Sequence, residues 1–172
     1  MGSVAIGETW GELLKQRALL YANRVGFADV EDYIAQKHSG KLEEQNRVMA
    51  IEAQTNLAWT LMTDLIRAVL VAQDEADATS IRGMTVGEWL EVARTRRVIT
   101  REQWEALDTL QGGRNELVHA YQHVRDRAAW KQIELMGGEI DSLMWRLQTK
   151  LEDIGERVEM DFPNFEGGVD LG

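Results

Sequence analysis

Apolar residues recur every three or four positions along almost the whole chain, and no run alternates apolar and polar residues as a strand does. The one proline, Pro163, lies near the C-terminal end. This pattern predicts an all-α protein, an antiparallel bundle resembling a four-helix bundle, with one or two short extra helices. We expect a single helical domain over residues 1–158. The acidic tail over 159–172, with its glycines and proline, is predicted to be unstructured.

Helix-capping residues and glycines divide the chain into segments. Thr9 is a candidate N-cap for a first helix that ends near Gly26, and a short second helix is expected over 29–37. Residues 41–77 contain no glycine or proline, which predicts one long helix. A polar connection is expected to follow over 74–83.

Two capping boxes mark the next helices. In Thr85-Val86-Gly87-Glu88 and in Thr100-Arg101-Glu102-Gln103, a threonine hydroxyl can bond the amide three residues on, while the acid or amide side chain reaches back. These boxes predict a short helix over 88–96 and a longer one from Arg101.

The apolar stripe of that longer helix stays in phase across Gly112-Gly113 and reaches Val124, which favours a continuous helix. Two helical glycines cost about 1 kcal/mol each relative to alanine. We expect the close approach of another backbone to compensate, with a break in the helix as the alternative. Asp126 is then predicted to cap a last helix that runs to about Val158.

The composition is that of one globular domain of 172 residues, with 44% hydrophobic residues and a net charge of −10. There is no cysteine, which excludes disulfides, thiolate metal sites and cysteine nucleophiles. The chain has no apolar run long enough for a membrane span and no leader-like start, so we expect a cytoplasmic protein with no membrane partner.

The charge is unevenly distributed. Residues 94–131 carry eight lysines and arginines against five acids, so this part is basic within an acidic chain. Such a region can hold a short nucleic-acid strand by its phosphates, or it can reflect charges scattered by chance.

Candidate chemistry is concentrated in Arg114-Asn115-Glu116-Leu117-Val118-His119-Ala120-Tyr121. In a helix, Arg114, Asn115, His119 and Tyr121 would border one apolar stripe. Arginine binds phosphate through two donors at once, and histidine can accept and return a proton near neutral pH. This pair suits metal-free cleavage of RNA. One such pair is sparse, and a two-fold symmetric dimer would supply a second.

Other chemistries fit the sequence less well. The three histidines, His38, His119 and His123, show no HExxH spacing, so we expect no metal site and no cofactor. By themselves, a histidine and a tyrosine on the flank of a helix are more often packing residues than catalysts.

The pattern Arg114-Asn115-x-x-x-His119-x-Tyr121 resembles the RNxxxHxY signature of HEPN-domain proteins and is most similar to the HepT-type toxins of toxin–antitoxin pairs. The capped helix that begins at Thr85, the turn before Arg101 and the long helix around Ile51 also follow that family's layout. The resemblance covers about residues 10–152.

This resemblance implies a metal-independent endoribonuclease toxin whose groove forms at a homodimer interface. Arg114 and His119 would be catalytic, Asn115 would position the substrate, and a nucleotidyltransferase antitoxin would attach AMP to Tyr121. Among other HEPN proteins are non-catalytic modules that bind a nucleotide or a partner nucleotidyltransferase, and this is the alternative.

Residues outside the motif are further candidates. Glu52 and Asn56, on the long helix, are candidates to support the site. Arg125 and Arg127 either extend the phosphate-binding surface or are solvated charges.

Overall fold

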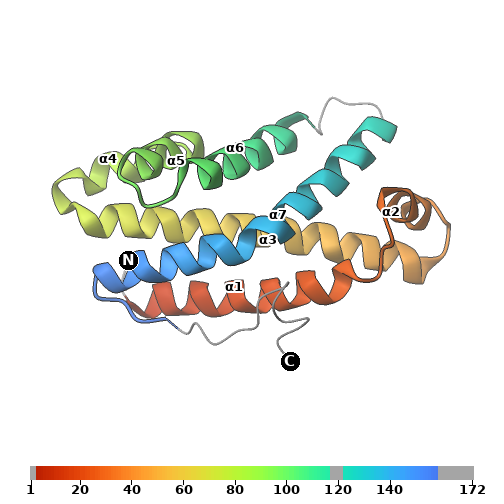
Figure 1. Cartoon of the computed structure of the whole chain (residues 1–172), viewed down its shortest axis with the longest axis horizontal. Helices are drawn as coiled ribbons and strands as arrows, with labels where there is room; N and C mark the ends of the chain where they lie inside the picture. The colour runs from red at the N-terminus through yellow and green to blue at the C-terminus, as the bar shows by residue number, and fades with distance from the viewer. Residues whose placement is uncertain (1–2, 117–121, 159–172) are drawn as a thin grey trace.

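The computed structural model describes residues 3–116 and 122–158, and all regular secondary structure within these ranges is helical (Figure 1). The long helices are α1 (Ser3–Arg24), α3 (Leu42–Gln73), α6 (Arg101–Glu116) and α7 (Gln122–Asp153). The short ones are α2 (Val30–Lys37), the 3-10 helix η1 (Glu75–Asp77), α4 (Ala78–Arg82) and α5 (Val86–Thr95). The prediction of an all-α protein is confirmed, and the predicted tail over 159–172 lies outside the described residues.

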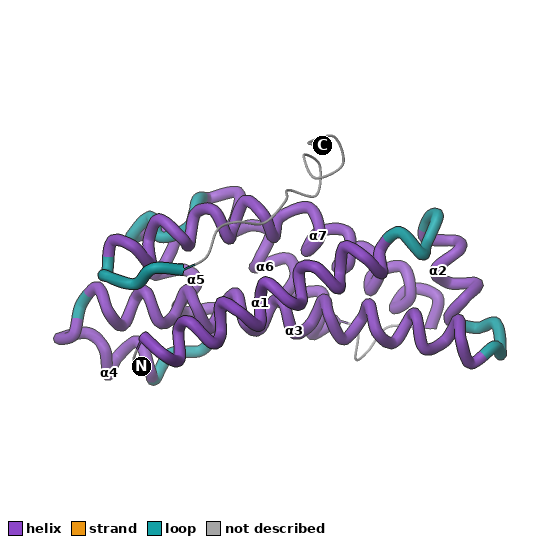
Figure 2. The backbone as a smooth tube through the Cα atoms, turned by 90° about the horizontal axis from the view of Figure 1, so that it is seen from below, coloured by secondary structure: helices purple, strands orange, loops and turns teal. Residues whose placement is uncertain are grey.

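Helix α3 is the centre of the bundle. It packs against α1, α2, α4, α5 and α7, and α6 packs against α5 and α7. Helices α1 and α6 run in one direction and α3 and α7 in the opposite one, so the long helices are antiparallel (Figure 1). The short α2 lies across one end of the bundle, where it contacts α3 and α7 (Figures 1 and 2).

The predicted apolar stripes supply the core. On α3, Ile51, Leu65 and Val69 are each no more than 1% exposed, whereas Leu57 is 38% exposed. The second half of α3 is buried on several faces, since its buried residues include the adjacent pairs Leu65 and Ile66, and Val69 and Leu70. Within the described ranges, no helix combines the length and the apolar character needed to cross a membrane.

Both capping boxes form as predicted. Thr85 Oγ1 accepts from the Glu88 amide, and Glu88 Oε1 accepts from the Thr85 amide at 2.9 Å. The Thr100 and Gln103 pair makes the same two bonds at the start of α6. Each pair therefore satisfies amides that a helix start leaves without helical partners.

Several of the predicted helix boundaries are wrong: α3 ends at Gln73 and not near Asp77, and α7 ends at Asp153 and not near Val158. Helix α1 already begins at Ser3, so Thr9 lies inside it and its hydroxyl donates to the Ala5 carbonyl at 2.8 Å instead of capping. The predicted polar connection over 74–83 contains η1 and α4, because the Asp74 side chain accepts from the Ala76 amide and starts a new turn there.

Helix α6 continues through Gly112-Gly113, as the phase of its apolar stripe predicts. Among the described residues, no close backbone approach is found at Gly112, because a Cβ added at that position would meet none of their atoms within 4 Å. Asp126 is not an N-cap either, since α7 starts at Gln122 and Asp126 lies inside it. Val124 therefore belongs to α7, where it is 46% exposed.

Candidate functional site

The Arg114–Tyr121 motif spans the end of α6 and the approach to α7. Arg114 and Asn115 belong to the last turn of α6, and α7 begins at Gln122, the residue after Tyr121. The side chains of Arg114 and Asn115, together with the whole of His119 and Tyr121, lie outside the described residues. The structure thus describes α6, which leads into the motif, and α7, which follows it.

A cavity of about 450 Å³ lies between the middle of α3, the first half of α7 and the end of α2. Sites for small molecules in proteins typically have volumes of ~300–1,000 Å³. Its lining combines four charged side chains (Lys37, Glu52, Arg125, Asp126), three polar ones (Thr55, Asn56, Gln132) and two apolar ones (Ala129, Ile133). The turns of α7 that follow the motif therefore form one wall of this cavity.

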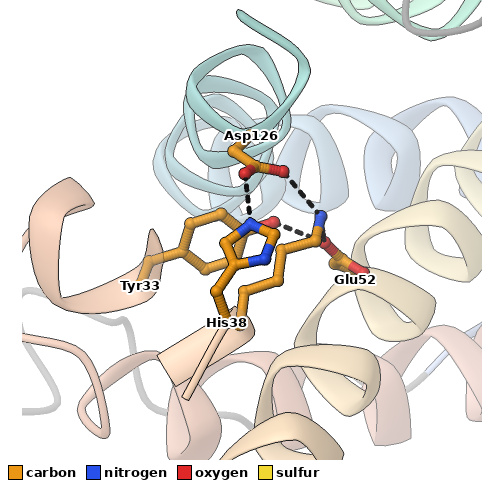
Figure 3. A network of polar contacts seen from close by, with 5 residues as sticks. Tyr33, His38, Glu52 and Asp126 are labelled. Atoms are coloured by element: carbon orange, nitrogen blue, oxygen red, sulfur yellow. Dashed lines mark hydrogen bonds and ion pairs between the residues drawn. The ribbon is translucent and has the colours of Figure 1, made fainter. Parts of the chain in front are cut away.

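A buried carboxylate, Asp126, joins α7 to α2 (Figure 3). Its Oδ1 lies 3.1 Å from Lys37 Nζ, and its Oδ2 lies 2.7 Å from His38 Nε2. Lys37 Nζ also donates to Glu52 Oε2 at 3.0 Å. The Asp126 side chain is only 2% exposed, so its carboxylate is largely shielded from water, whereas His38, Lys37 and Glu52 are partly exposed.

Tyr33 links this network to the aromatic core. Its hydroxyl donates to Glu52 Oε2, and Figure 3 shows the ring beside His38 and below Asp126. The ring is fully buried, with the centroids of Phe27 and Trp130 at 5.8 Å and 5.2 Å. Tyr33 of α2 is thus held by apolar packing around its ring and by the hydrogen bond from its hydroxyl to Glu52 of α3.

The network raises the pKa of two of its members. Burial, followed by the hydrogen bond and charge of Glu52 and the charge of Asp126, raises the pKa of Tyr33 well above its ordinary value of 10.0. Burial alone would lower the pKa of Lys37, but the two carboxylates outweigh it, so that pKa is raised above 10.5. Lys37 therefore stays cationic and Tyr33 stays neutral across the physiological range.

The cavity balances its own formal charges, since two cations, Lys37 and Arg125, face two carboxylates, Glu52 and Asp126. Asn56 and Gln132 add amide groups that can both donate and accept hydrogen bonds. Gln132 also donates to the Leu110 carbonyl at 3.4 Å, which ties this wall to α6. Such a lining suits an uncharged polar group, such as a base or a sugar, whereas a phosphate needs a further cation.

The candidates predicted outside the motif separate into two groups. Glu52 and Asn56 line the cavity together, and Arg125 lies on its opposite wall. Arg127 instead pairs with Glu31 at 2.5 Å, with both side chains at least half exposed. Of the two arginines considered as an extension of the phosphate surface, only Arg125 therefore belongs to the cavity.

Sequence reasoning missed Asp126, Lys37, Tyr33 and His38 as members of one network. A signal for Asp126 is present, because it precedes Trp130 by four residues and Ile133 by seven. This spacing places the acid on the buried stripe of α7 and not at a cap. The partners on α2 carry no such signal, since His38 is 88 residues away from Asp126 in the chain.

No protein-family model, curated protein or solved structure matches this chain. Within residues 3–116 and 122–158, no three histidine, aspartate or glutamate side chains group in a way that could hold a metal ion.

Replacing Asp126 with asparagine keeps the shape of the side chain and removes its charge. We expect Asp126→Asn to lower the free energy of unfolding by about 2 kcal/mol, because Lys37 and His38 lose a buried charged acceptor. The measurement is chemical denaturation, combined with amide hydrogen exchange of α2. Glu31→Gln is the matched control, since it removes the exposed α2–α7 ion pair and should change stability far less. Equal losses of unfolding free energy in Asp126→Asn and Glu31→Gln would contradict the stabilising role of the buried acid.

Alkaline pH should weaken the fold through Tyr33. Its folded-state pKa is raised, so the stability it contributes is present below its unfolded value of about 10 and is lost as pH rises above that value. Lys37, whose pKa is also raised, acts in the same direction. We expect the wild type to lose stability between about pH 10 and pH 12, with a shallower decline in Tyr33→Phe. Identical pH profiles for the two proteins would show that Tyr33 does not contribute.

Proposed function

We propose that this chain is a metal-independent endoribonuclease of the HEPN superfamily, a HepT-like toxin that acts on RNA in the cytoplasm. The proposal depends on one observation above all, the full Arg114-Asn115-x-x-x-His119-x-Tyr121 pattern at the junction of two long antiparallel helices. Its surroundings support it, because α7 leaves the motif and lines a cavity one turn later with Arg125 and Asp126.

The proposed reaction is cleavage of RNA by its own ribose. His119 accepts the proton of a 2′-hydroxyl, whose oxygen attacks the neighbouring phosphorus, and the bond to the 5′-oxygen breaks. Arg114 stabilises the negative charge that develops on the phosphate oxygens, and Asn115 positions the substrate. His119 returns the proton to the leaving 5′-oxygen, which gives a 5′-hydroxyl and a 2′,3′-cyclic phosphate.

The cavity suits the part of the substrate that is not cleaved. Glu52 and Asn56 on α3 and Gln132 on α7 offer hydrogen-bonding groups, and the balanced charges of the lining leave the phosphate to the motif's arginine. In this arrangement, Glu52 and Asn56 support the site by contacting the nucleoside next to the cleaved bond.

A homodimer is part of the proposal. Met49 on α3 is 65% exposed, Leu57 is 38% exposed, and Val124 at the start of α7 is 46% exposed. Leu57 and Val124 adjoin the cavity residues Asn56 and Arg125 in sequence. Exposed apolar side chains on α3 and α7, the two long helices that line the cavity, support association of two copies, which would bring together two Arg114–His119 pairs.

The second candidate is a non-catalytic module that binds a nucleotide or a partner nucleotidyltransferase. The observation in its favour is the cavity itself, whose volume and mixed lining fit a small polar ligand without any chemistry. Under this alternative, a nucleotide binds but RNA is not cleaved.

Separate Arg114→Ala and His119→Ala substitutions should each reduce RNA cleavage at least a hundredfold, because each removes a group that acts in the transition state. The assay is cleavage of end-labelled RNA in the presence of a chelator, with analysis of the product ends for 2′,3′-cyclic phosphate. His123→Ala is the matched control, a nearby histidine outside the pattern, and circular dichroism verifies that each variant folds. Wild-type cleavage by both motif variants would refute the nuclease, and nucleotide binding without any cleavage by the wild type would favour the alternative.

Modification of Tyr121 tests the proposed antitoxin. When the chain is co-expressed with its nucleotidyltransferase, we expect intact-mass spectrometry to show added AMP on the wild type and none on Tyr121→Phe. AMP beside Arg114 adds negative charge and bulk, so the modified protein should lose RNA cleavage. Tyr21→Phe, on α1, is the control and should be modified like the wild type. AMP found on Tyr121→Phe would place the modification elsewhere.

A further inference from the structure

The turn between α5 and α6 contains a backbone conformation that arginine rarely adopts. Arg97 has a φ of 60°, and among the described residues it is the one non-glycine residue with a positive φ. An L-amino acid in this region brings its Cβ close to its own backbone, so glycine or asparagine is the usual residue there. Retaining an arginine at such a position suggests that its side chain is needed.

The turn is held firmly in this conformation. The Val98 amide donates to the Ala93 carbonyl at 2.8 Å, and the Val98 and Ile99 side chains are buried. From α7, Arg146 donates through Nη2 to the Arg97 carbonyl at 2.6 Å and through Nε to the Val98 carbonyl at 3.3 Å. Two guanidinium groups, those of Arg97 and Arg146, are thereby attached to one short, fixed segment, and Arg97 is exposed.

These two arginines differ from their neighbours in charge balance. The other arginines around the turn each pair with an acid on the surface: Arg94 with Glu91, Arg96 with Asp77 at 2.8 Å, and Arg101 with Glu105 at 3.3 Å. Arg97 and Arg146 have no carboxylate partner within the described part of the chain. On a chain of net charge −10, the turn therefore presents two uncompensated cations.

We propose that the Arg97–Arg146 turn binds a backbone phosphate of the RNA substrate. Guanidinium groups bind phosphate oxygens through paired hydrogen bonds, and a fixed segment loses little conformational freedom on binding. A contact to phosphate does not distinguish one base from another, so it adds affinity and orients the RNA strand without sequence preference.

The distance from the turn to Arg114 indicates how long the RNA substrate must be, and this step rests on the proposed nuclease function. Helix α6 starts at Arg101, just after the turn, and has Arg114 in its last turn, thirteen residues on. At 1.5 Å per residue, this is about 20 Å of helix. The substrate is therefore a single strand that extends several nucleotides beyond the cleaved bond, and a dinucleotide lacks the phosphate that reaches the turn.

The test is Arg97→Gly, which removes the charge and places at φ 60° the residue that tolerates it best. We expect its thermal midpoint to equal or exceed that of the wild type. Its affinity for a non-cleavable 2′-O-methyl RNA of about ten nucleotides should fall roughly threefold to tenfold, and the slope of log K against log salt should decrease by about 0.7. Arg97→Lys should keep most of the affinity. Lys15→Ala, an exposed cation on α1 that changes the net charge equally, is the control and should bind like the wild type.

The outcomes separate the turn from the nuclease. A folded Arg97→Gly variant that binds this RNA with wild-type affinity and salt dependence overturns the phosphate site, even if the wild type cleaves RNA. Reduced binding in Arg97→Gly but not in Lys15→Ala supports the site, even if the wild type cleaves nothing and the proposed nuclease fails. With an active wild type, Arg97→Gly should slow cleavage of the long strand and leave that of a dinucleotide unchanged, and an equal loss on both substrates overturns the assigned position.

Discussion

The buried carboxylate of Asp126 is the interaction on which the rest of the site depends. It comes one turn after the start of α7, and it binds Lys37 and His38 at the end of α2 while Lys37 also binds Glu52 of α3. Three helices from distant parts of the sequence are therefore joined by one acid. Because a buried charge without partners is strongly unfavourable, α7 is held in the orientation that gives Asp126 these partners. The cavity walls depend on that orientation, and so does the direction in which the chain leaves the motif.

The same network limits the negative charge that this acidic protein presents at the cavity. Within the cavity, each carboxylate has a cation beside it, so the many acids of the chain do not make this region strongly negative. At the other end of α6, Arg97 in the α5–α6 turn and Arg146 of α7, which donates to carbonyls of that turn, have no carboxylate partner within the described part of the chain. A polyanion approaching along α6 would meet a neutral cavity at one end and a positive turn at the other. Net charge alone is therefore a poor guide to what this surface binds.

Local patterns predicted the secondary structure well, and tertiary contacts decided most of what they missed. The capping boxes at Thr85 and Thr100 involve side chains three residues apart, so sequence alone could identify them. Thr9 and Asp126 were misassigned as caps because either residue type can also bond elsewhere, to a carbonyl of its own helix or to a distant helix. Glu52 and Asn56 were candidates from the sequence to support the site, and they line the cavity. Lys37 and Tyr33 could not be found in this way, because they reach Glu52 only through the packing of α2 against α3.

The open space at Gly112 has a practical consequence. Every residue except proline has a higher helix propensity than glycine, and a Cβ added there would meet no atom of the described residues within 4 Å. The chain contains no cysteine, so a thiol introduced at this position would be unique in each subunit. A spin label or fluorophore attached to it would sit two residues before Arg114 on a continuous helix. In an assembly of two copies, the separation of two such probes would directly report how far apart the paired helix ends lie.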